Sequence, residues 1–508
     1  MIDMRGKKTK WLRLASLLTI LCLFAAACGG GDGDGEEEPA GDDTEAAADG
    51  GTEDGGDGGD EGGGEQEPVR LGILGECEGP FGGFHEDVVG GTVFAMVRHA
   101  GATVNSTTSA LDGFEGAEVA GTPIELVGIG CGDDTADTIV REVRRLVEQD
   151  GANVVIGPLS GDESIAIAEY AESQPELTFI DGAAGAQEAT LEVQAPNYFR
   201  FHADGAMWNA GLGDLLHNEQ GWDTVAVIAD DYSFGHTSAA GFIADFCAVG
   251  GQVTHRVFPP LGTTDYSSYI QQLPDPGEVD GYFWVVGGTG TQAALEAFIN
   301  AKGDLTGEQH AGNLFFNPDL AQALGPDIAG AYIGGFATPP TDVTSPEIES
   351  YLEDADATWE TLPSGLSGGE PAPPSTAAGF GFFYMYYLAG KALIDALEAT
   401  GGVLGEGQED LKEALRNLTL EAPYGEVTLD ENNNGIVDVY LSQLVVDEES
   451  GEVVQETVAM VPDVDQTFGG TFSTETPPPS RDFPPCEERD LPWSGNLVPV
   501  VDGVPQDQ

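Results

Sequence analysis

Apolar residues from position 69 onward fall into short runs that alternate with segments of helical spacing. Glycine or polar residues bound these runs, which is typical of buried strands. The expected strands are 69–75, 124–130, 153–157, 177–180, 224–229, 281–286, 313–316 and 331–336. Strands that alternate with helices predict an α/β fold built on parallel sheets.

Helical spacing is clearest in residues 139–147, where apolar side chains recur on one face. Asp134 or Thr135 is placed to cap the start of this helix, and Gly151 is placed to end it. The pattern therefore predicts one amphipathic helix between two buried strands.

Two stretches of the chain look alike. Strand 69–75 precedes a helix over about 84–100, and strand 224–229 precedes a helix over about 235–249. The part after residue 69 is also too long, at about 430 residues, for a single hydrophobic core. Neither strand-to-helix turn carries a phosphate-binding glycine motif, so nucleotide binding has no motif to rest on. We expect two domains of α/β type.

The first 28 residues have the layout of an export signal. Basic residues between Arg5 and Arg13 precede an apolar run over 14–27, with small residues just before Cys28. That run is shorter than the ~20 residues that span a bilayer. The run Ala-Ala-Ala-Cys at 25–28 resembles the lipobox of bacterial lipoproteins, which implies that residues 1–27 are removed and that Cys28 carries lipid. An ordinary secretory signal or a single anchor helix are the alternatives.

Residues 28–68 are expected to form a disordered acidic tether. Positions 29–67 contain sixteen acidic residues, no basic ones and almost no apolar surface to bury. The whole chain has 88 Asp and Glu against 18 Lys and Arg. That charge makes nucleic acid and anionic lipid headgroups poor partners. We attribute it to a salty or alkaline habitat, where salt screens self-repulsion.

Four cysteines follow Cys28, and they are Cys77, Cys131, Cys247 and Cys486. In an exported chain this even number permits two disulfides with three connectivities. If the apolar runs before Cys77 and Cys131 are strands of one parallel sheet, both thiols leave the same sheet edge. That favours Cys77–Cys131 and leaves Cys247–Cys486 by elimination. Zinc is disfavoured, because no C-x-x-C pair occurs.

Short motifs follow one another in an order that resembles a known family. They are Leu-Gly-Ile-Leu-Gly at 71–75 with Gly79-Pro80, the apolar run 124–130 with Asp133-Asp134, and Val-Val-Ile-Gly-Pro-Leu-Ser-Gly at 154–161. Further along come Asp-Asp-Tyr-Ser-Phe-Gly at 230–235, the aromatic helix 382–393, and the expected strand and hairpin at 424–435. Over roughly 69–445 the chain resembles the type I periplasmic solute-binding proteins of the leucine/isoleucine/valine-binding group.

The resemblance implies the type I periplasmic binding protein fold, with two doubly wound parallel-sheet lobes joined by three hinge crossovers. Lobe 1 would comprise 69–203 and 341–427, and lobe 2 would comprise 204–340 and 428–475. A Pro-rich C-terminal extension covers 476–508. Parallel sheets bind ligands at the carboxyl ends of their strands, and a cleft between two such lobes can close by hinge motion.

The family works by handing a small-molecule solute to a membrane ABC permease and its ATPase. We therefore expect a monomer in the cell envelope, lipid-anchored on the outer face of the cytoplasmic membrane. A ligand-sensing module for a signalling partner is the alternative, and an α/β hydrolase is a third.

The resemblance also implies ligand contacts in lobe 1. Ser160 and Gly161 follow the third strand, where the free N–H groups of a helix start suit a carboxylate. Asp162 and Glu163 put negative charge at this place. We expect both to be acids of the first helical turn that face water. If one points inward, the ligand group there is cationic or neutral.

Further expected contacts come from both lobes. Ala183 lies in a loop whose family counterpart holds the polar groups of an amino acid, and Gly185 replaces the threonine of that loop. Phe84 stands where the family has a first-lobe tyrosine, and Phe234 aligns with a tyrosine that stacks on the ligand.

Two more positions complete the implied site. Thr289 takes the place of another aromatic residue, and Asp319 aligns with the acid that pairs with the ligand ammonium. An acid and a stacking ring indicate an amine-bearing solute, an amino acid or a relative of one. The missing threonine and tyrosine argue against assuming leucine itself.

Catalytic motifs are missing from the sequence. Neither a nucleophile elbow nor H-E-x-x-H occurs, and His85, His202 and His236 are expected to be exposed or packed loop residues. Segment 430–441 begins like a calcium loop but has Leu441 at its twelfth position, so a hairpin turn is expected. We expect no enzyme activity, no cofactor and no metal.

Overall fold

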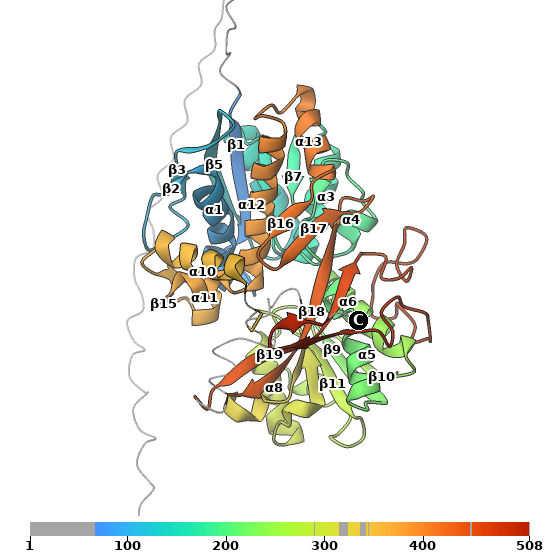
Figure 1. The fold of residues 1–508 in the computed structure, drawn as a ribbon. Coiled ribbons are helices and arrows are strands. Elements are labelled where there is room, and N and C mark those ends of the chain that lie inside the picture. The colour runs from blue at the N-terminus through green and yellow to red at the C-terminus, as the bar shows by residue number, and fades with distance from the viewer. Residues whose placement is uncertain are drawn as a thin grey trace, which may run out of the picture. The chain divides into compact units, whose positions relative to one another are not determined.

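The computed structural model describes residues 67–288, 290–313, 324–335, 342–343, 345–447 and 450–506. From Gly64 to the end the chain forms one compact unit. Its described part contains two large sheets, each covered by helices (Figure 1). We call the sheet that contains β1, with its helices, lobe 1 and the sheet that contains β9, with its helices, lobe 2.

The lobe 1 sheet has the strand order β4-β5-β1-β6-β7-β8. Its strands are β1 (Val69–Glu76), β4 (Ala117–Val119), β5 (Thr122–Gly132), β6 (Val154–Ile156), β7 (Thr178–Ile180) and β8 (Tyr198–Phe199). All neighbours pair in parallel except the edge strand β4. β6 and β7 are wholly buried and apolar except at Thr178, as expected for parallel strands with helices on both faces.

Helices of lobe 1 come from two separate parts of the chain. They are α1 (His85–Ala100), α2 (Ala136–Arg144) with its π-helical continuation η2 (Arg145–Gln149), α3 (Gly161–Glu172), α4 (Glu188–Leu191), α10 (Pro346–Thr358), α11 (Pro374–Ala378), α12 (Gly381–Ala399) and α13 (Glu409–Arg416). α1 packs closely on α12 because Gly91 has no side chain. A Cβ there would lie 2.1 Å from the carbonyl oxygen of Phe383.

The lobe 2 sheet has the order β10-β9-β11-β12-β13-β18-β19-β20-β21. Its strands are β9 (Thr224–Ala229), β10 (Gln252–Val257), β11 (Gly281–Val285), β12 (His310–Gly312), β13 (Tyr332–Gly335), β18 (Gly435–Val446), β19 (Val453–Val464), β20 (Val498–Val501) and β21 (Val504–Pro505), with β16 (Leu420–Ala422) and β17 (Gly425–Leu429) joined through β18. Pairing is parallel from β10 to β13 and antiparallel from there on.

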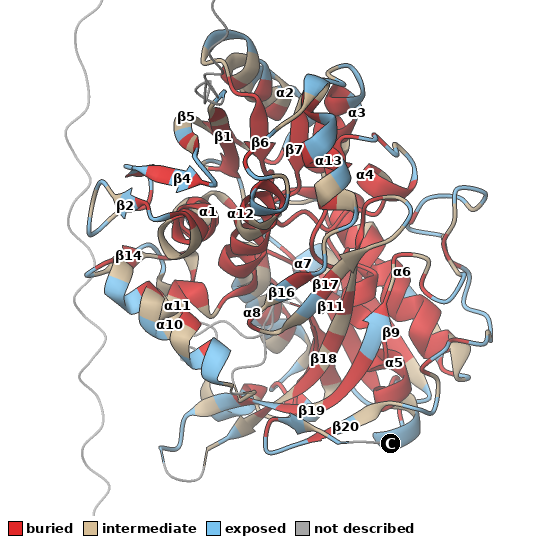
Figure 2. Cartoon of the chain, turned by 45° about the horizontal axis from the view of Figure 1, so that its top comes forward, coloured by how far each residue is buried: buried red, intermediate tan, exposed pale blue. Residues whose placement is uncertain are grey.

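Lobe 2 carries α5 (Leu212–Asp214), the π-helical η4 (Leu215–Glu219), α6 (Ser233–Ala248), α7 (Ser267–Ile270) and α8 (Gly290–Lys302). The remaining short elements are β2 (Thr103–Val104), β3 (Phe114–Glu115), β14 (Leu362–Pro363), β15 (Pro371–Ala372), η1 (Gly82–Phe84), η3 (Met207–Asn209), η5 (Gly307–Gln309), η6 (Gly325–Ile328), η7 (Gly365–Ser367) and η8 (Glu406–Gln408). Figure 2 shows that α6 and α12 are buried along most of their length, so each forms part of a core.

Among the described elements the chain changes lobe three times. It enters lobe 2 after β8, returns to lobe 1 between β13 and α10, and enters lobe 2 again at β17 and β18. This α/β architecture of two parallel-sheet lobes confirms the expected fold. The residue boundaries given above for the lobes stay predictions.

Seven of the eight expected strands lie within two residues of their predicted positions, and the eighth is shifted. The structure also contains strands that the pattern did not predict, among them β8, β10 and β19. We expected a strand over 313–316, but β12 is His310–Gly312 and Asn313 follows it, while 314–316 lie outside the described residues. His310 is buried there and accepts a hydrogen bond from Trp284 Nε1 at 2.9 Å. Burial lowers the pKa of His310 to about 3, so the ring is neutral at ordinary pH. A neutral histidine can occupy a core position of a strand, and a search for apolar residues misses it.

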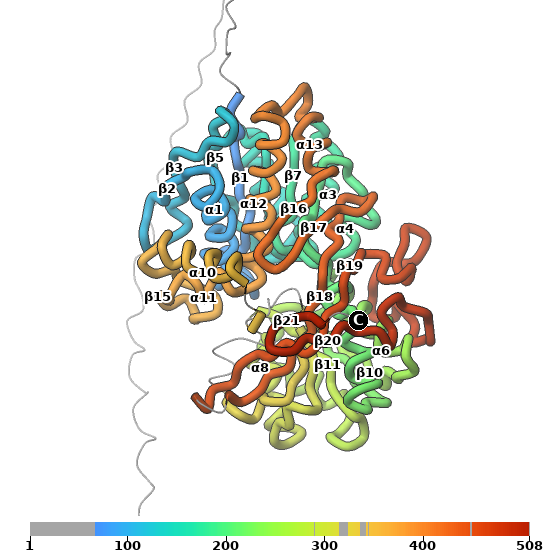
Figure 3. The backbone as a smooth tube through the Cα atoms, viewed as in Figure 1, coloured from blue at the N-terminus to red at the C-terminus, as the bar shows by residue number. Residues whose placement is uncertain are grey.

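The C-terminal extension belongs to lobe 2. β20 pairs with β19, and the buried Trp493 donates to Asp245 of α6. Arg481 forms an ion pair with Asp231 at the end of β9. Figure 3 shows the extension in dark red, with β20 and β21 beside β19. A segment that composition marked only as Pro-rich is therefore part of a folded lobe.

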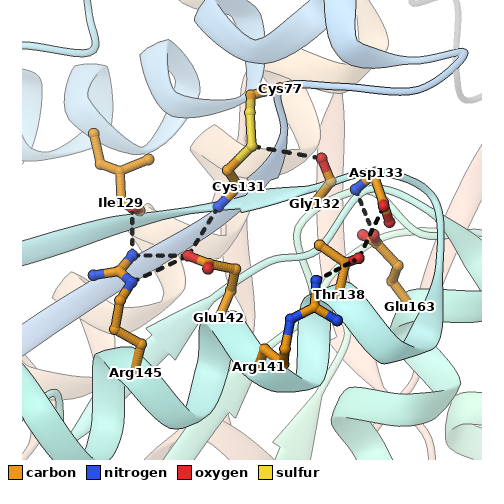
Figure 4. The surroundings of a disulfide bond; sticks show 10 residues. All are labelled: Cys77, Ile129, Cys131, Gly132, Asp133, Thr138, Arg141, Glu142, Arg145 and Glu163. Atoms are coloured by element: carbon orange, nitrogen blue, oxygen red, sulfur yellow. Dashed lines mark hydrogen bonds and ion pairs between the residues drawn. A yellow bond between two sulfur atoms is a disulfide. The ribbon is translucent and has the colours of Figure 1, made fainter. Parts of the chain in front are cut away.

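Both disulfides pair as expected. Cys77 is bonded to Cys131 and Cys247 to Cys486. In the parallel register of β1 and β5, Gly75 lies opposite Cys131 and Glu76 opposite Gly132, so the two thiols meet where the strands end. Figure 4 shows this bond beside the acidic loop that follows β5.

Removing the second disulfide should destabilise the protein. The Cys247–Cys486 bond joins residues that are 239 positions apart in the sequence, and in the variant C247S/C486S the unfolded chain is free of this constraint. We therefore expect the free energy of unfolding, measured with urea, to fall by about 2–4 kcal/mol. Adding reductant to this variant controls for the Cys77–Cys131 bond. Peptide mapping without reductant that links Cys77 to Cys247 would show the pairing to be wrong.

Candidate functional site

A small pocket lies between the two lobes, with a cavity volume of about 10 Å³. Lobe 1 contributes Phe81, Leu159, Ala183, Gly185 and Phe382, and lobe 2 contributes Trp208, Tyr232 and Phe234. Phe81 follows β1, Leu159 follows β6 and Tyr232 follows β9. Because ligands bind open parallel sheets at the carboxyl ends of their strands, this pocket is the candidate ligand site.

Aromatic rings form most of the pocket wall. In lobe 2 the Phe234 ring lies 5.0 Å from the Trp208 ring and 6.0 Å from the Tyr232 ring, measured between centroids. In lobe 1 the centroids of Phe81 and Phe382 are 6.2 Å apart. Among the described residues no lysine, arginine or histidine lines this pocket. The wall can therefore surround an apolar or cationic group but offers no positive charge.

Gly185 makes room for one of these rings. A Cβ at this position would come within 2.5 Å of the Phe234 ring. The threonine that the family resemblance placed here would therefore collide with Phe234. Glycine at 185 and phenylalanine at 234 fit as a pair, so the pocket lacks the threonine hydroxyl but has room for the Phe234 ring.

The loop after β6 offers backbone N–H groups, but a side chain of the protein already uses them. Leu159 N and Ser160 N donate to Glu76 Oε1 at 3.0 and 2.8 Å. Glu76 is the last residue of β1 and is buried. The start of α3 thus binds an anion that belongs to the chain itself, in the way that helix starts bind anionic groups.

Two further acids lie beside Glu76. Burial, the charge of Glu76 and a hydrogen bond with the Glu76 side chain raise the pKa of Glu163. Burial also raises the pKa of Glu76, and this hydrogen bond opposes that rise. Asp134 Oδ2 accepts from Phe81 N at 3.3 Å, and burial followed by the charge of Glu76 raises the pKa of Asp134 to about 7.

Our expectation that Asp162 and Glu163 face water is wrong. Glu163 is fully buried and accepts from Asp133 N at 3.1 Å (Figure 4). It fits because Gly132 has no side chain, since a Cβ there would lie 2.6 Å from Glu163 Oε1. Asp162 is half-buried, and its Oδ1 accepts from Ser233 N of lobe 2 at 3.1 Å.

The predicted contacts lie in different places. Ala183, Gly185 and Phe234 line the pocket. Ser160 is buried at the start of α3, and a Cβ on Gly161 would lie 2.5 Å from Ser233 Oγ, so this loop faces lobe 2. These roles as ligand contacts stay predictions.

Phe84, another predicted contact, does not line the pocket. Phe84 packs on Phe382, with ring centroids 5.1 Å apart, and so lies one residue behind the wall. Thr289 and Asp319 lie outside the described residues.

Sequence reasoning missed five residues of the wall, namely Phe81, Leu159, Trp208, Tyr232 and Phe382. All except Trp208 belong to or adjoin motifs that carried the family resemblance. Trp208 lies in η3, just after the chain enters lobe 2, and no motif marks it.

The histidines and the calcium-like loop have structural roles in the fold. His202 is buried 2.9 Å from Asp181, and His236 lies 3.0 Å from Asp231, so both are packed. Residues 430–434 turn the chain between β17 and β18, which confirms the hairpin. In the described part of the chain no group of three or more His, Cys, Asp or Glu is arranged to hold a metal ion. No helix in that part combines the length and apolar character needed to cross a membrane.

Comparison with known proteins gives consistent matches. The family model described as periplasmic binding protein matches residues 68–451. A Leu/Ile/Val-binding protein homolog 6 of Brucella melitensis biotype 1 is 23% identical over 336 residues, which cover 62% of this chain and 78% of that protein.

Solved structures share the fold. An ABC transporter substrate-binding protein from Sphaerobacter thermophilus superposes with a TM-score of 0.63 at 22% identity, over 78% of this chain and 99% of that one. A solute-binding protein from R. palustris in complex with benzoate gives 0.62 at 18% identity, over 78% and 98%. A leucine-binding protein from Thermotoga maritima gives 0.59 at 19% identity, over 78% and 99%.

The buried acid Asp134 should make stability depend on pH. Its folded pKa is raised from 3.8 to about 7, so its contribution is complete below pH ~4 and is lost as the pH rises through about 7. Asparagine cannot ionise and also tolerates the positive φ of 67° at this position. Above pH 7 we therefore expect Asp134→Asn to be more stable to urea than the unmodified protein, on the order of 2 to 4 kcal/mol, with a much smaller difference at pH 4.5.

The neighbouring variant Asp133→Asn is the control for this measurement. Burial alone would raise the pKa of Asp133, but hydrogen bonds from Thr135 and Thr138 outweigh burial and lower it. Asp133→Asn should therefore bring no gain at high pH. Parallel pH profiles for Asp134→Asn and the unmodified protein would contradict the assignment.

Proposed function

The chain belongs to the periplasmic binding protein family, as a solute-binding protein of the leucine/isoleucine/valine-binding group of ABC transporters, and we propose that its solute is a small molecule that carries an amine. The observation that supports this most directly is the pocket wall, where five aromatic rings from both lobes meet and no basic side chain occurs among the described residues. Aromatic faces attract cations through their quadrupole, and more strongly when water is excluded.

Acidic groups around the pocket favour the same ligand charge. Asp134 accepts from the backbone of Phe81, Asp162 accepts from Ser233, and the buried Asp230 directly follows β9. The pKa of Tyr232 is raised above all by burial and then by the charges of Asp230 and Asp134. Burial raises the pKa of Asp134 and of Asp230 to about 7. Above this pH the two acids create a negative potential at the rings, which favours an ammonium ligand over a neutral ligand of the same shape.

Lobe closing supplies the signal that a permease can read. The Asp162–Ser233 hydrogen bond joins the start of α3 in lobe 1 to the start of α6 in lobe 2. Opening the pocket must break this bond and expose the rings, so a ligand that fills the pocket stabilises the closed form. On this proposal the permease binds the closed pair of lobes, and the solute passes to it when they open.

Lipid attachment at Cys28 is part of the same proposal. A receptor held at the membrane by a tether over 28–68 would stay close to its permease, which raises their effective concentration. The acidic composition of that stretch favours an extended chain.

The solute ammonium is proposed to pair with Asp319, whose position aligns with the acid of the family. Removing that acid leaves the cation without its partner in the closed cleft, at a cost of about 2 to 5 kcal/mol. Asp319→Ala should thus weaken binding of the tightest amine from a thermal-shift screen by at least about thirtyfold in titration calorimetry. Asp327→Ala, at an exposed position of η6, removes the same charge and should leave the affinity unchanged. Near-native affinity of Asp319→Ala would show the alignment to be mistaken.

Anchoring can be tested in cells that export the chain. Cys28→Ser removes the thiol that would carry lipid, so we expect the protein in the soluble fraction or unprocessed, whereas the unmodified protein sediments with membranes. Ala48→Ser, in the acidic stretch, is the control and should behave as the unmodified protein does. Membrane retention with normal processing of Cys28→Ser would rule out lipid attachment at this residue.

A further inference from the structure

One side chain has already filled the place where this fold offers hydrogen-bond donors to an anion. Glu76 Oε1 accepts from both Leu159 N and Ser160 N, and the Glu76 side chain is fully buried. Leu159 itself lines the pocket. A ligand carboxylate at this wall would therefore meet an occupied pair of N–H groups and the negative charge that Glu76 and Glu163 share.

Among the described side chains of the wall, none offers a positive charge in place of those two N–H groups. The eight lining residues are apolar or aromatic, apart from the Tyr232 hydroxyl. Trp208 Nε1 donates to the carbonyl oxygen of Ala203 at 3.0 Å, and the Gly185 carbonyl oxygen accepts from Gly205 N at 2.9 Å. A carboxylate brought here would lose its hydration without gaining a charged partner, which is costly in a closed pocket.

We propose that this pocket selects organic cations that lack a carboxylate, and that Glu76 determines this selection by occupying the N–H groups of the loop after β6. The proposal rests on the proposed function and narrows its ligand class. The rings hold the cationic or alkylated end of the solute, while the surrounding acids balance its charge. A zwitterionic amino acid is disfavoured because no described side chain of the wall offers its carboxylate an opposite charge.

Pairs of compounds that differ by a carboxylate test this selection. The pairs are isoamylamine with leucine, phenethylamine with phenylalanine, and choline with glycine betaine. Each compound is titrated into the exported, disulfide-bonded protein by calorimetry at pH 7.5 and constant salt. We expect at least one pair to bind, with the carboxylate-free member tighter by at least about tenfold.

Two variants of Glu76 assign the selection to this residue. Glu76→Gln keeps an oxygen that accepts from Leu159 N and Ser160 N, so it should keep the preference. Glu76→Ala frees Leu159 N and Ser160 N. The ratio of the two dissociation constants within a pair should then fall by at least about threefold, because the carboxylate of the second compound can accept from these N–H groups. If Glu76→Ala does not fold, the pairs measured on the unmodified protein and on Glu76→Gln decide whether the pocket selects against carboxylates.

The outcomes separate this inference from the receptor function. Leucine, phenylalanine or glycine betaine binding as tightly as its partner overturns the selection against carboxylates, while an amine receptor remains. Failure of all three amines to bind also overturns the inference. Benzoate and acetamide in the same assay then show whether the pocket is still a solute site, since binding of either retains a receptor with a different ligand class.

Discussion

A buried ion pair at the exit from lobe 1 holds the rest of the site in place. Arg200 Nη2 lies 3.4 Å from Asp181 Oδ2, and neither side chain has any exposed surface. His202 and Tyr198 also bind Asp181. Burial alone would raise the pKa of Asp181, but the charge of Arg200 and the bond from His202 keep it below its usual value. A buried charge without its partner costs several kcal/mol, so these residues act as a unit.

This ion pair also ties together segments that are far apart in the sequence. Arg200 donates to the carbonyl oxygen of Ala186 and to Asn434 Oδ1, at 2.8 and 3.2 Å. Ala186 ends the loop that brings Ala183 and Gly185 to the pocket, and Asn434 lies where the chain enters lobe 2 for the last time. The shape of the pocket wall and the geometry of the hinge thus depend on the same guanidinium group.

The fold was largely readable from the pattern of the sequence, because parallel strands covered on both faces must be apolar. That rule located β1, β5, β9 and β11 within a residue or two. It also fixed the first disulfide, since adjacent parallel strands end side by side. It failed at β12, where a neutral histidine fills a core position.

The candidate site was less predictable, because its chemistry depends on neighbours that only the fold brings together. Glu163 looked like a solvent-facing acid of a first helical turn, and only the space above Gly132 shows why it turns inward. Gly185 looked like the loss of a hydroxyl, whereas the structure shows that the missing side chain makes room for the Phe234 ring. Trp208 has no local signal at all.

The two ends of the described chain belong to different lobes. Glu67 stands two residues before β1 of lobe 1, while Gln506 donates from its backbone to Pro499 in the β20–β21 hairpin of lobe 2. Cys486 fixes the extension to α6, so this end follows lobe 2 as a rigid part of it. Energy transfer between fluorophores attached at these two positions would therefore change with the hinge angle. Such a labelled protein could be used to follow solute binding by single molecules.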